Sequence, residues 1–482
     1  MSHLINRLPL YLFLVLGSFL FTGRSAISAG AIEWADPMKI AGPGYVNYPD
    51  LVVDQQGRVH FFYSQGTSIN SQDNAIYYRI FDGEQLSPPI DVLITPGIMD
   101  ARTPSVVIDE SGIIHVVWVG GTNIWYSQAP ITNTGNATAW TKPILLDGPT
   151  ASNTRPALQV TDNSLRLAYI LYGNNPGIYV LASENGGSIW GSPVSVANPK
   201  KEGLSPVSLD MCIDDGERMH IVWYEGDISS RGLAAQDIYY INQSGAINSW
   251  SGAALFDSVS NGNYEGQYGP SMPSIACRDS EIYIYWYGAP MGQRHFRFSS
   301  DAGQSWLDFG RITEFRGLTY PAGLAFDRNG SLYAASGSLD NRLMFMVMDG
   351  YSWSEVNPID INSMGPHYPR MVSFNGQILH VIWQEVMSNE IWYREGKIIS
   401  VPELPNFMTT PVNVDPTALP PTVLPSSVLP LEEIDTPLST PMIAGDSHPI
   451  NFSPNSTILL SSACGLLILI IGFVISRNKL GR

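Results

Sequence analysis

The sequence predicts an all-β fold, a seven-bladed β-propeller of four-stranded antiparallel blades that spans residues 32–400. A unit of about 50 residues recurs, and each unit contains short β-branched and aromatic runs separated by turn residues. A proline opens each unit, at Pro49, Pro104, Pro156, Pro206, Pro273, Pro321 and Pro369. Four strands per unit at this period are the signature of a β-propeller, because radial packing buries both faces of each small sheet.

The second unit shows how each blade is expected to be built. Its strands are expected at residues 105–108, 113–119, 123–128 and 144–146, with turns rich in Gly, Asp and Ser between them. Trp140 precedes the fourth strand. The seventh unit lacks such a tryptophan strand, whereas the segment 34–40 before the first unit begins with Trp34. We therefore expect this segment to become the outer strand of the last blade and to close the ring.

The segments outside the propeller predict export and membrane anchoring. An apolar run follows Arg7 and ends in small residues, which is typical of a secretory signal, and residues 457–475 carry no charge and precede a basic end. The expected segments are a signal peptide (1–31), a Pro/Ser/Thr-rich disordered stalk (401–456), a transmembrane helix (457–475) and a short basic cytoplasmic tail (476–482). We expect a single-pass cell-membrane protein with the propeller outside the cell.

Composition and cysteine positions narrow the possible partners. The formal net charge of −17 argues against a nucleic-acid partner. No C-x-x-C or H-E-x-x-H spacing occurs, so we predict no metal site and no cofactor. Cys212 and Cys277 lie in the first strands of neighbouring blades, one register position apart. They are therefore expected on opposite faces of their strands, which disfavours a disulfide between them.

Two turns share the pattern Ser-x-Asp/Asn-x-Gly-x-x-Trp. The residues are Ser183, Asn185, Gly187 and Trp190 in one turn and Ser299, Asp301, Gly303 and Trp306 in the other. The acid or amide should cap turn amides, the glycine should take a positive φ, and the tryptophan should pack between sheets. These turns resemble the Asp-box, or BNR repeat, of the sialidase-like β-propeller superfamily. The resemblance covers residues 32–400, although sialidases usually have six blades, and the box itself implies fold rather than catalysis.

The repeat provides an internal control for site residues. His60, His115, His220 and His380 hold one second-strand position in four units, so we interpret them as packing residues. Residues that break the repeat gather where one blade passes to the next and after the second strands, and these positions should share one face of the ring. They are Arg102, Arg155, Arg370, His367, Tyr320, Tyr368, Glu225, Asp227, Arg231, Glu265 and Glu385, with Asp73 and Asp100 beside them.

The resemblance to sialidases implies roles for some of these residues. In that family three arginines clamp a carboxylate, a Tyr activated by a Glu is the nucleophile, and an Asp is the acid/base. The implied clamp is Arg102, Arg155 and Arg370, the implied nucleophile is Tyr320 or Tyr368, and the implied base is Glu225, Glu265 or Glu385. The segment Arg102-Thr-Pro104 keeps the Arg-x-Pro part of the sialidase motif and lacks its Phe. The alternative is that the arginines form surface ion pairs and the tyrosines simply line the axis.

The predicted function is therefore open between three classes. The first is a membrane-anchored extracellular module that binds a glycan or another cell-envelope protein, with Tyr264 and Glu265 of a long fourth-blade loop, His367 and Glu385 as ligand-binding residues. The second is an exo-glycosidase of sialidase type that uses the implied catalytic set. The third is a structural spacer whose axis is filled by side chains. The sequence predicts no oligomeric state.

Overall fold

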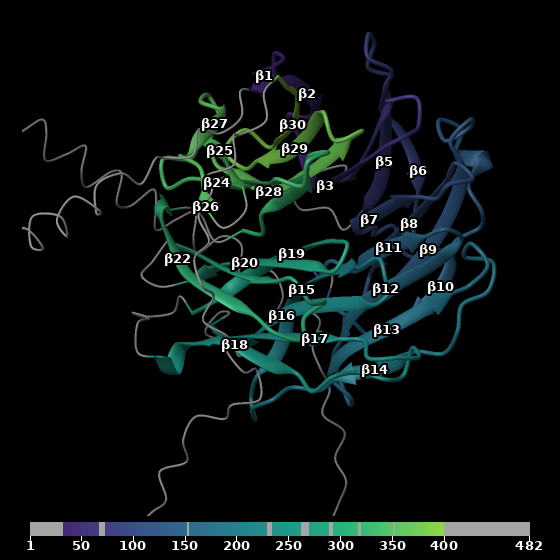
Figure 1. Cartoon of the computed structure of the whole chain (residues 1–482). Helices are drawn as coiled ribbons and strands as arrows, with labels where there is room; N and C mark the ends of the chain where they lie inside the picture. The colour runs from purple at the N-terminus through teal and green to yellow at the C-terminus, as the bar shows by residue number, and fades with distance from the viewer. Residues whose placement is uncertain are drawn as a thin grey trace, which may run out of the picture. The chain divides into compact units, whose positions relative to one another are not determined.

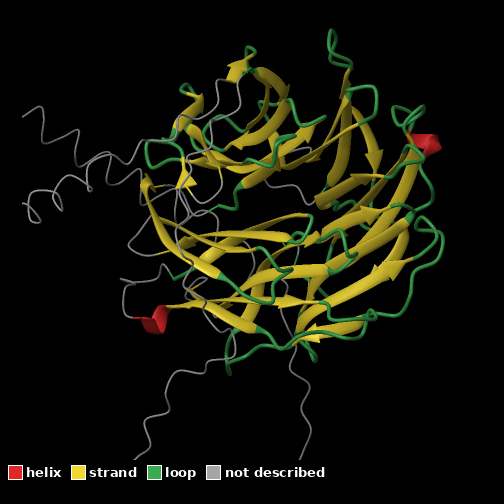
Figure 2. Ribbon diagram, viewed as in Figure 1, coloured by secondary structure: helices red, strands yellow, loops and turns green. Residues whose placement is uncertain are grey.

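The computed structural model describes residues 32–66, 73–151, 154–228, 234–261, 269–288, 293–316, 320–349 and 352–399. Within them, seven antiparallel sheets surround a central axis, which confirms the predicted seven-bladed propeller (Figures 1 and 2). The predicted signal peptide, stalk, transmembrane helix and tail lie outside the described residues, as do Arg231, Tyr264 and Glu265. No helix in the described ranges is long and apolar enough to cross a membrane.

Each blade runs from an inner strand at the axis to an outer strand. Blade 1 comprises β3 (Tyr45–Val53), β4 (Val59–Gly66), β5 (Asn74–Phe81) and β6 (Ile90–Leu93). Blade 2 comprises β7 (Arg102–Ile108), β8 (Ile113–Gly120), β9 (Asn123–Pro130) and β10 (Ile144–Asp147). Blade 3 comprises β11 (Ala157–Thr161), β12 (Ser164–Leu171), β13 (Gly177–Ser183) and β14 (Val194–Ala197). Blades 4 and 5 comprise β15 (Ser205–Ile213), β16 (Met219–Asp227), β17 (Ala234–Asn242), β18 (Ala254–Ser258); and β19 (Ser271–Arg278), β20 (Glu281–Gly288), β21 (Gln293–Ser299), β22 (Leu307–Arg316).

Blades 6 and 7 each place two short strands at the outer position. They comprise β23 (Gly323–Phe326), β24 (Leu332–Gly337), β25 (Leu343–Asp349), β26 (Ser352–Trp353), β27 (Asn357–Asp360); and β28 (Pro366–Phe374), β29 (Ile378–Glu385), β30 (Glu390–Ile398), β1 (Ile32–Trp34), β2 (Met38–Ala41). The 3₁₀-helices η1 (Ala137–Ala139) and η2 (Val259–Asn261) lie in connections.

The first strands of the ring complete its last blade, as predicted. β1 and β2 both pair with β30, and Ile32 lies opposite Ile398 while Met38 lies opposite Tyr393. Inner strands begin at one face of the ring, which we call the proline face, and end at the other, the exit face. Because β28, β29 and β30 alternate in direction, Ile398 and its partner Ile32 lie at the exit face.

The repeated histidines are buried parts of the blades, as predicted. Each Nδ1 atom lies 2.7 to 2.8 Å from a tyrosine hydroxyl, in the pairs His60–Tyr78, His115–Tyr126, His220–Tyr240 and His380–Tyr393. In the first three, Nε2 also lies 3.2 to 3.3 Å from the carboxylate of Asp54, Asp109 or Asp214. Blade 7 has Phe374 at the position of this acid, so the buried Nε2 of His380 has no described partner.

The two turns of the Ser-x-Asp/Asn-x-Gly-x-x-Trp pattern have the expected chemistry. The side chains of Asn185 and Asp301 each accept a hydrogen bond of 2.8 Å from an amide four residues later. Gly187 and Gly303 both have a φ of +78°. The ring of Trp306 packs edge-on against Tyr240 of the preceding blade, with centroids 4.8 Å apart, as Trp190 does against Tyr126. The turns therefore join neighbouring sheets.

Cys212 and Cys277 form a disulfide, which corrects the expectation that they would not pair. Their Cα atoms are 5.6 Å apart. The register shift is real, since Cys212 lies opposite His220 whereas Cys277 lies opposite Ile282, one position beyond the equivalent Tyr283. Opposite faces are what this bridge requires, because Cys212 must face the following blade and Cys277 the preceding one. The expectation treated two strands of separate sheets as if they shared one sheet.

The disulfide should contribute measurably to stability. A bridge that closes a loop of 65 residues is expected to lower the entropy of the unfolded chain. The Cys212→Ala/Cys277→Ala variant should lose about 2–4 kcal/mol of unfolding free energy in urea titrations without reductant. Reductant should shift wild type toward the variant and leave the variant unchanged. Equal midpoints for both proteins without reductant would contradict the bridge.

The buried His380 should make the stability of the fold depend on pH. Burial lowers the pKa of His380 from 6.5 to about 4. Between these values the unfolded chain binds a proton at this histidine and the folded chain does not, so the stability that His380 contributes should fall as pH drops from 6.5 toward 4. His380→Gln, which can still donate to Tyr393, should flatten this decline in melting temperature. An unchanged slope across that pH range would argue against the prediction.

Candidate functional site

The proline face owes its shape to a repeated backbone kink. In four blades the residue before the opening proline has a positive φ, namely Tyr48 (53°), Thr103 (50°), Met272 (51°) and Tyr368 (49°). Each kink coincides with a register shift between the inner strand and its neighbour. Left-handed backbone is costly for residues with a Cβ, and such strain is often found at functional sites. Tyr48, Met272 and Tyr368 all line a cavity at this end of the axis, which we call the mouth.

Aromatic side chains line part of the mouth and continue beside it. The ring centroid of Tyr368 lies 5.4 Å from that of Tyr48 and 5.3 Å from that of Tyr320, and the rings of Tyr320 and His367 are 3.6 Å apart. Tyr224 lines the mouth from blade 4. Burial raises the pKa of Tyr368 to about 12 and also raises that of Tyr320, and it lowers the pKa of His367 to about 4. These rings are therefore neutral at neutral pH.

A layer of charged residues separates the mouth from a deeper pocket along the axis, which we call the axial pocket. Arg155, Asp210 and Arg370 line both cavities, and Asp50 lines the deeper one. Arg155 pairs with Asp50 at 2.6 Å. Burial, with help from nearby Arg370, lowers the pKa of Arg155 to about 10. Burial also raises the pKa of Asp210, and Arg370 opposes that effect. We call these four residues the charged layer.

Side chains next to the charged layer connect one blade to the next. An inner strand has one unpaired edge at the axis, and its buried amides need acceptors. The amides of Val106, Leu158, Ile275 and Ala322 donate to Asp50, Ser105, Asp210 and Ser274 respectively, at 2.9 to 3.1 Å. Each acceptor belongs to the blade before its donor. The acceptors share one register position on the inner strand. Each lies two residues before the inner-strand residue that pairs with the repeated histidine, or with Tyr283 in blade 5.

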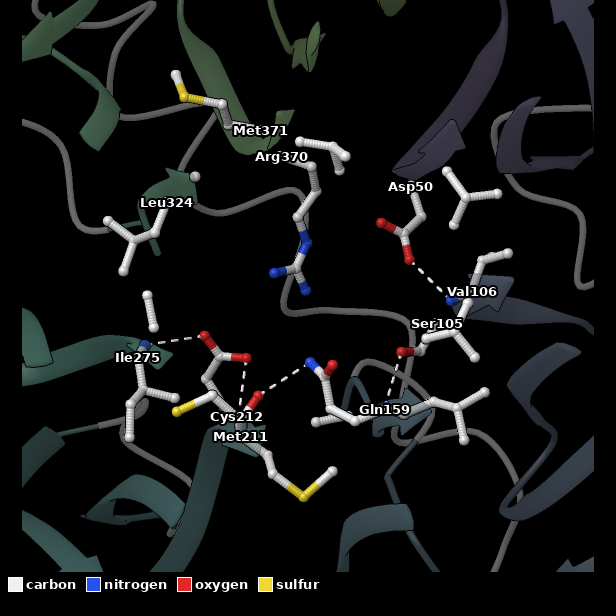
Figure 3. Close-up of a pocket in the computed structure, with 18 of the residues that line it drawn as sticks. Asp50, Ser105, Val106, Gln159, Met211, Cys212, Ile275, Leu324, Arg370 and Met371 are labelled. Atoms are coloured by element: carbon white, nitrogen blue, oxygen red, sulfur yellow. Dashed lines mark hydrogen bonds between the residues drawn. The ribbon is translucent and has the colours of Figure 1, made fainter. Parts of the chain in front are cut away.

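Arg370 holds this same register position in blade 7. A guanidinium has only donors, so it cannot accept an amide of the next blade. Among the described residues, Arg370 makes no hydrogen bond or ion pair, and its buried Nε has no partner. Figure 3 shows its guanidinium pointing into the axial pocket, between Asp50 and the strand of Met211. Arg370 therefore neither accepts an amide of the next blade nor pairs with a described acid.

The axial pocket has a volume of about 480 Å³. Beyond the charged layer, toward the exit face, its lining is mainly Val, Ile, Leu and Met from the seven inner strands, together with the Cys212–Cys277 disulfide. Gln159 also lines it, and its amide donates to the carbonyl of Met211 at 3.1 Å. The pocket thus has charged side chains at one end, while mostly apolar side chains and the backbone edges of the inner strands line the rest.

The structure brings together only part of the predicted site. Arg155, Arg370 and Tyr368 meet at the mouth, and the rings of Tyr320 and His367 approach that of Tyr368 edge-on. Arg102 pairs instead with Asp100 at 2.5 Å, in a small cavity shared with Tyr48 but away from the axial pocket. No described contact joins Arg102 to the other two arginines.

The two described glutamates of the predicted site point into their own blades. Glu225 accepts from Trp223 Nε1 at 3.3 Å and from an amide at 3.0 Å. Glu385 accepts from Trp383 Nε1 at 2.5 Å and from an amide at 2.6 Å. Burial raises the pKa of both carboxyls. Neither lines the mouth or the axial pocket, and their matching contacts show a repeated Trp-x-Glu arrangement.

Asp50, Asp210 and Tyr224 belong to the site and were not predicted for it. Asp50 directly follows a unit-opening proline, as Arg370 does, and a search for charges at that position would have found it. Asp210 lies four residues after Pro206, because the first strand of blade 4 reaches the shared register position later than the others. Its place could not be read from spacing alone.

No family model and no curated protein matches the sequence. Among solved structures, an ulvan lyase of a new polysaccharide lyase family matches with a TM-score of 0.49 and 12% identity, over 76% of this chain and 94% of the lyase. A Hadza microbial sialidase matches with a TM-score of 0.44 and 14% identity, over 73% and 66%. The NanB sialidase of Streptococcus pneumoniae matches with a TM-score of 0.42 and 13% identity, over 80% and 72%.

The two axial arginines should respond differently to removal. Arg155→Leu leaves Asp50 as a buried charge without its partner and should cost about 2–4 kcal/mol of unfolding free energy. Arg370→Leu removes a cation that makes no ion pair with a described residue but lies near the buried acid Asp210, so its loss of stability should be clearly smaller than that of Arg155→Leu. Urea unfolding of both variants beside wild type measures the difference. An equal loss for the two variants would show that Arg370 is also a structural residue.

Proposed function

We propose that this chain is a membrane-anchored extracellular binding module, and that its ligand is a glycan with an acidic group held at the mouth. The observation that carries the proposal is Arg370, which has no described hydrogen-bond or ion-pair partner and lines the mouth together with Tyr48, Tyr224 and Tyr368. A guanidinium binds carboxylate or sulfate oxygens through paired hydrogen bonds. Flat aromatic faces such as Tyr48 and Tyr368 suit the apolar face of a sugar ring.

Three features support the extracellular, anchored arrangement. The leader-like and apolar terminal segments of the sequence favour export and anchoring. The Cys212–Cys277 disulfide suits an oxidising compartment. The described chain ends at the exit face, beside Ile398 and at the opposite face of the ring from the mouth, so a stalk that begins there does not begin at the mouth.

Binding fits the mouth better than hydrolysis by a tyrosine nucleophile. A nucleophile is activated by a neighbouring base or by a lowered pKa. Burial instead raises the pKa of Tyr368 to about 12 and that of Tyr320 as well. No carboxylate among the described residues is hydrogen-bonded to either hydroxyl. A spacer role leaves unexplained why a cation without a described partner lies on the axis.

A glycan array probed with the purified chain tests the proposal. Binding should favour sugars with a carboxylate or sulfate over their neutral counterparts, and Arg370→Gln should weaken it about tenfold or more, the effect of losing charged hydrogen bonds. Arg342→Gln, an exposed arginine in the connection between β24 and β25, is the matched control and should bind like wild type.

Two results would count against the proposal. Equal binding of acidic and neutral glycans would remove the role of Arg370. Turnover of a fluorogenic sialoside by wild type, lost in Arg370→Gln, would instead establish the glycosidase that the sialidase resemblance implies.

A further inference from the structure

The apolar part of the axial pocket has a specific construction. Six inner strands contribute partly buried apolar side chains to its lining, namely Val53, Val107, Val160, Ile213, Phe326 and Val372. Each of them also packs against a hydrophobic core between blades. One side of each side chain is therefore covered by the blade, and the other faces the pocket. Apolar side chains that keep part of their surface exposed favour a ligand that covers them.

The charges of the axial pocket are confined to one end. Arg155, Arg370, Asp50 and Asp210 form the charged layer next to the mouth, and the two cations balance the two acids in formal charge. Arg155 is already paired with Asp50, whereas Arg370 makes no ion pair within the described chain. The acids on either side should repel a dianion such as phosphate more strongly than a monoanion. The layer thus suits one singly charged anionic group at Arg370.

We propose that the axial pocket binds the carboxylate of an acyl chain, with its head on Arg370 and its hydrocarbon chain extending toward the exit face. The cavity of about 480 Å³ is within the usual size range of small-molecule sites, which are mostly apolar with a few polar groups. The carboxylate gives Arg370 the acceptor that the fold does not supply, and the chain covers Val107, Val160 and their neighbours. This inference goes beyond glycan binding and shares only Arg370 with it.

Photoaffinity labelling of the full-length chain in membranes tests the proposal. The probe is a twelve-carbon fatty acid with a diazirine near its methyl end, and mass spectrometry of the digested protein locates the crosslink. Label is expected on the inner strands that line the apolar part of the pocket, especially β7, β11 and β15. Label restricted to residues 457–475 would show partitioning near the membrane and would overturn the proposal.

Unlabelled competitors test the head and the chain separately. Acetate, hexanoate and dodecanoate should displace the probe with rising potency, about fourfold for each added methylene until the pocket is full. Dodecanol should compete much less well than dodecanoate, because it lacks the charge that Arg370 binds. Potency that does not depend on chain length would remove the acyl part of the proposal, and equal potency of the alcohol would remove the role of Arg370.

Variants separate this site from the proposed glycan site. Arg370→Gln should reduce labelling of the inner strands about tenfold, and Arg342→Gln should not change it. Val160→Phe narrows the apolar part of the pocket and should block labelling, while glycan binding at the mouth persists. Thermal melting checks that this variant folds. If the variant does not fold, the competitor series on wild type tests the acyl proposal. Inner-strand labelling without glycan binding would overturn only the glycan proposal, and glycan binding without labelling would overturn only the acyl proposal.

Discussion

The unpaired inner edge of each blade is the constraint on which this propeller depends. An inner strand has a sheet partner on one side only, so its axial amides must find acceptors elsewhere or lose a hydrogen bond in a buried place. The chain solves this with a short side chain of the preceding blade, as Asp50 does for Val106 and Ser105 for Leu158. These bonds connect neighbouring sheets and help to keep the axis open.

Arg370 is best understood against that constraint. It takes the acceptor position in the last blade but can only donate, so it adds a charge to the axis without serving the next blade. No described residue forms an ion pair or hydrogen bond with it, because Asp50 pairs with Arg155 and the oxygens of Asp210 accept amides of Met211 and Ile275. The kinked backbone before the prolines then places tyrosines over this charge. The mouth, the charged layer and the axial pocket therefore follow one another along the axis.

Much of the fold could be predicted because the same pattern of strands and turns recurs in seven units of the sequence. Strand runs and opening prolines predicted the blades, and the missing tryptophan strand predicted closure by the segment after Trp34. The Cys212–Cys277 bridge was not predicted, because face arguments within one sheet fail between two sheets. Part of the site could also be predicted from the sequence, since Arg155 and Arg370 directly flank opening prolines.

The rest of the site depended on geometry that spacing does not encode. A left-handed residue shifts the register of the inner strand, as Thr103 does beside Arg102, which pairs with Asp100 instead of joining the other arginines. The most direct test of the account is anomalous diffraction from crystals soaked in bromide. We expect a bromide ion on the axis at the guanidinium of Arg370. An Arg370 that instead pairs with Asp210, with no bromide beside it, would contradict the account.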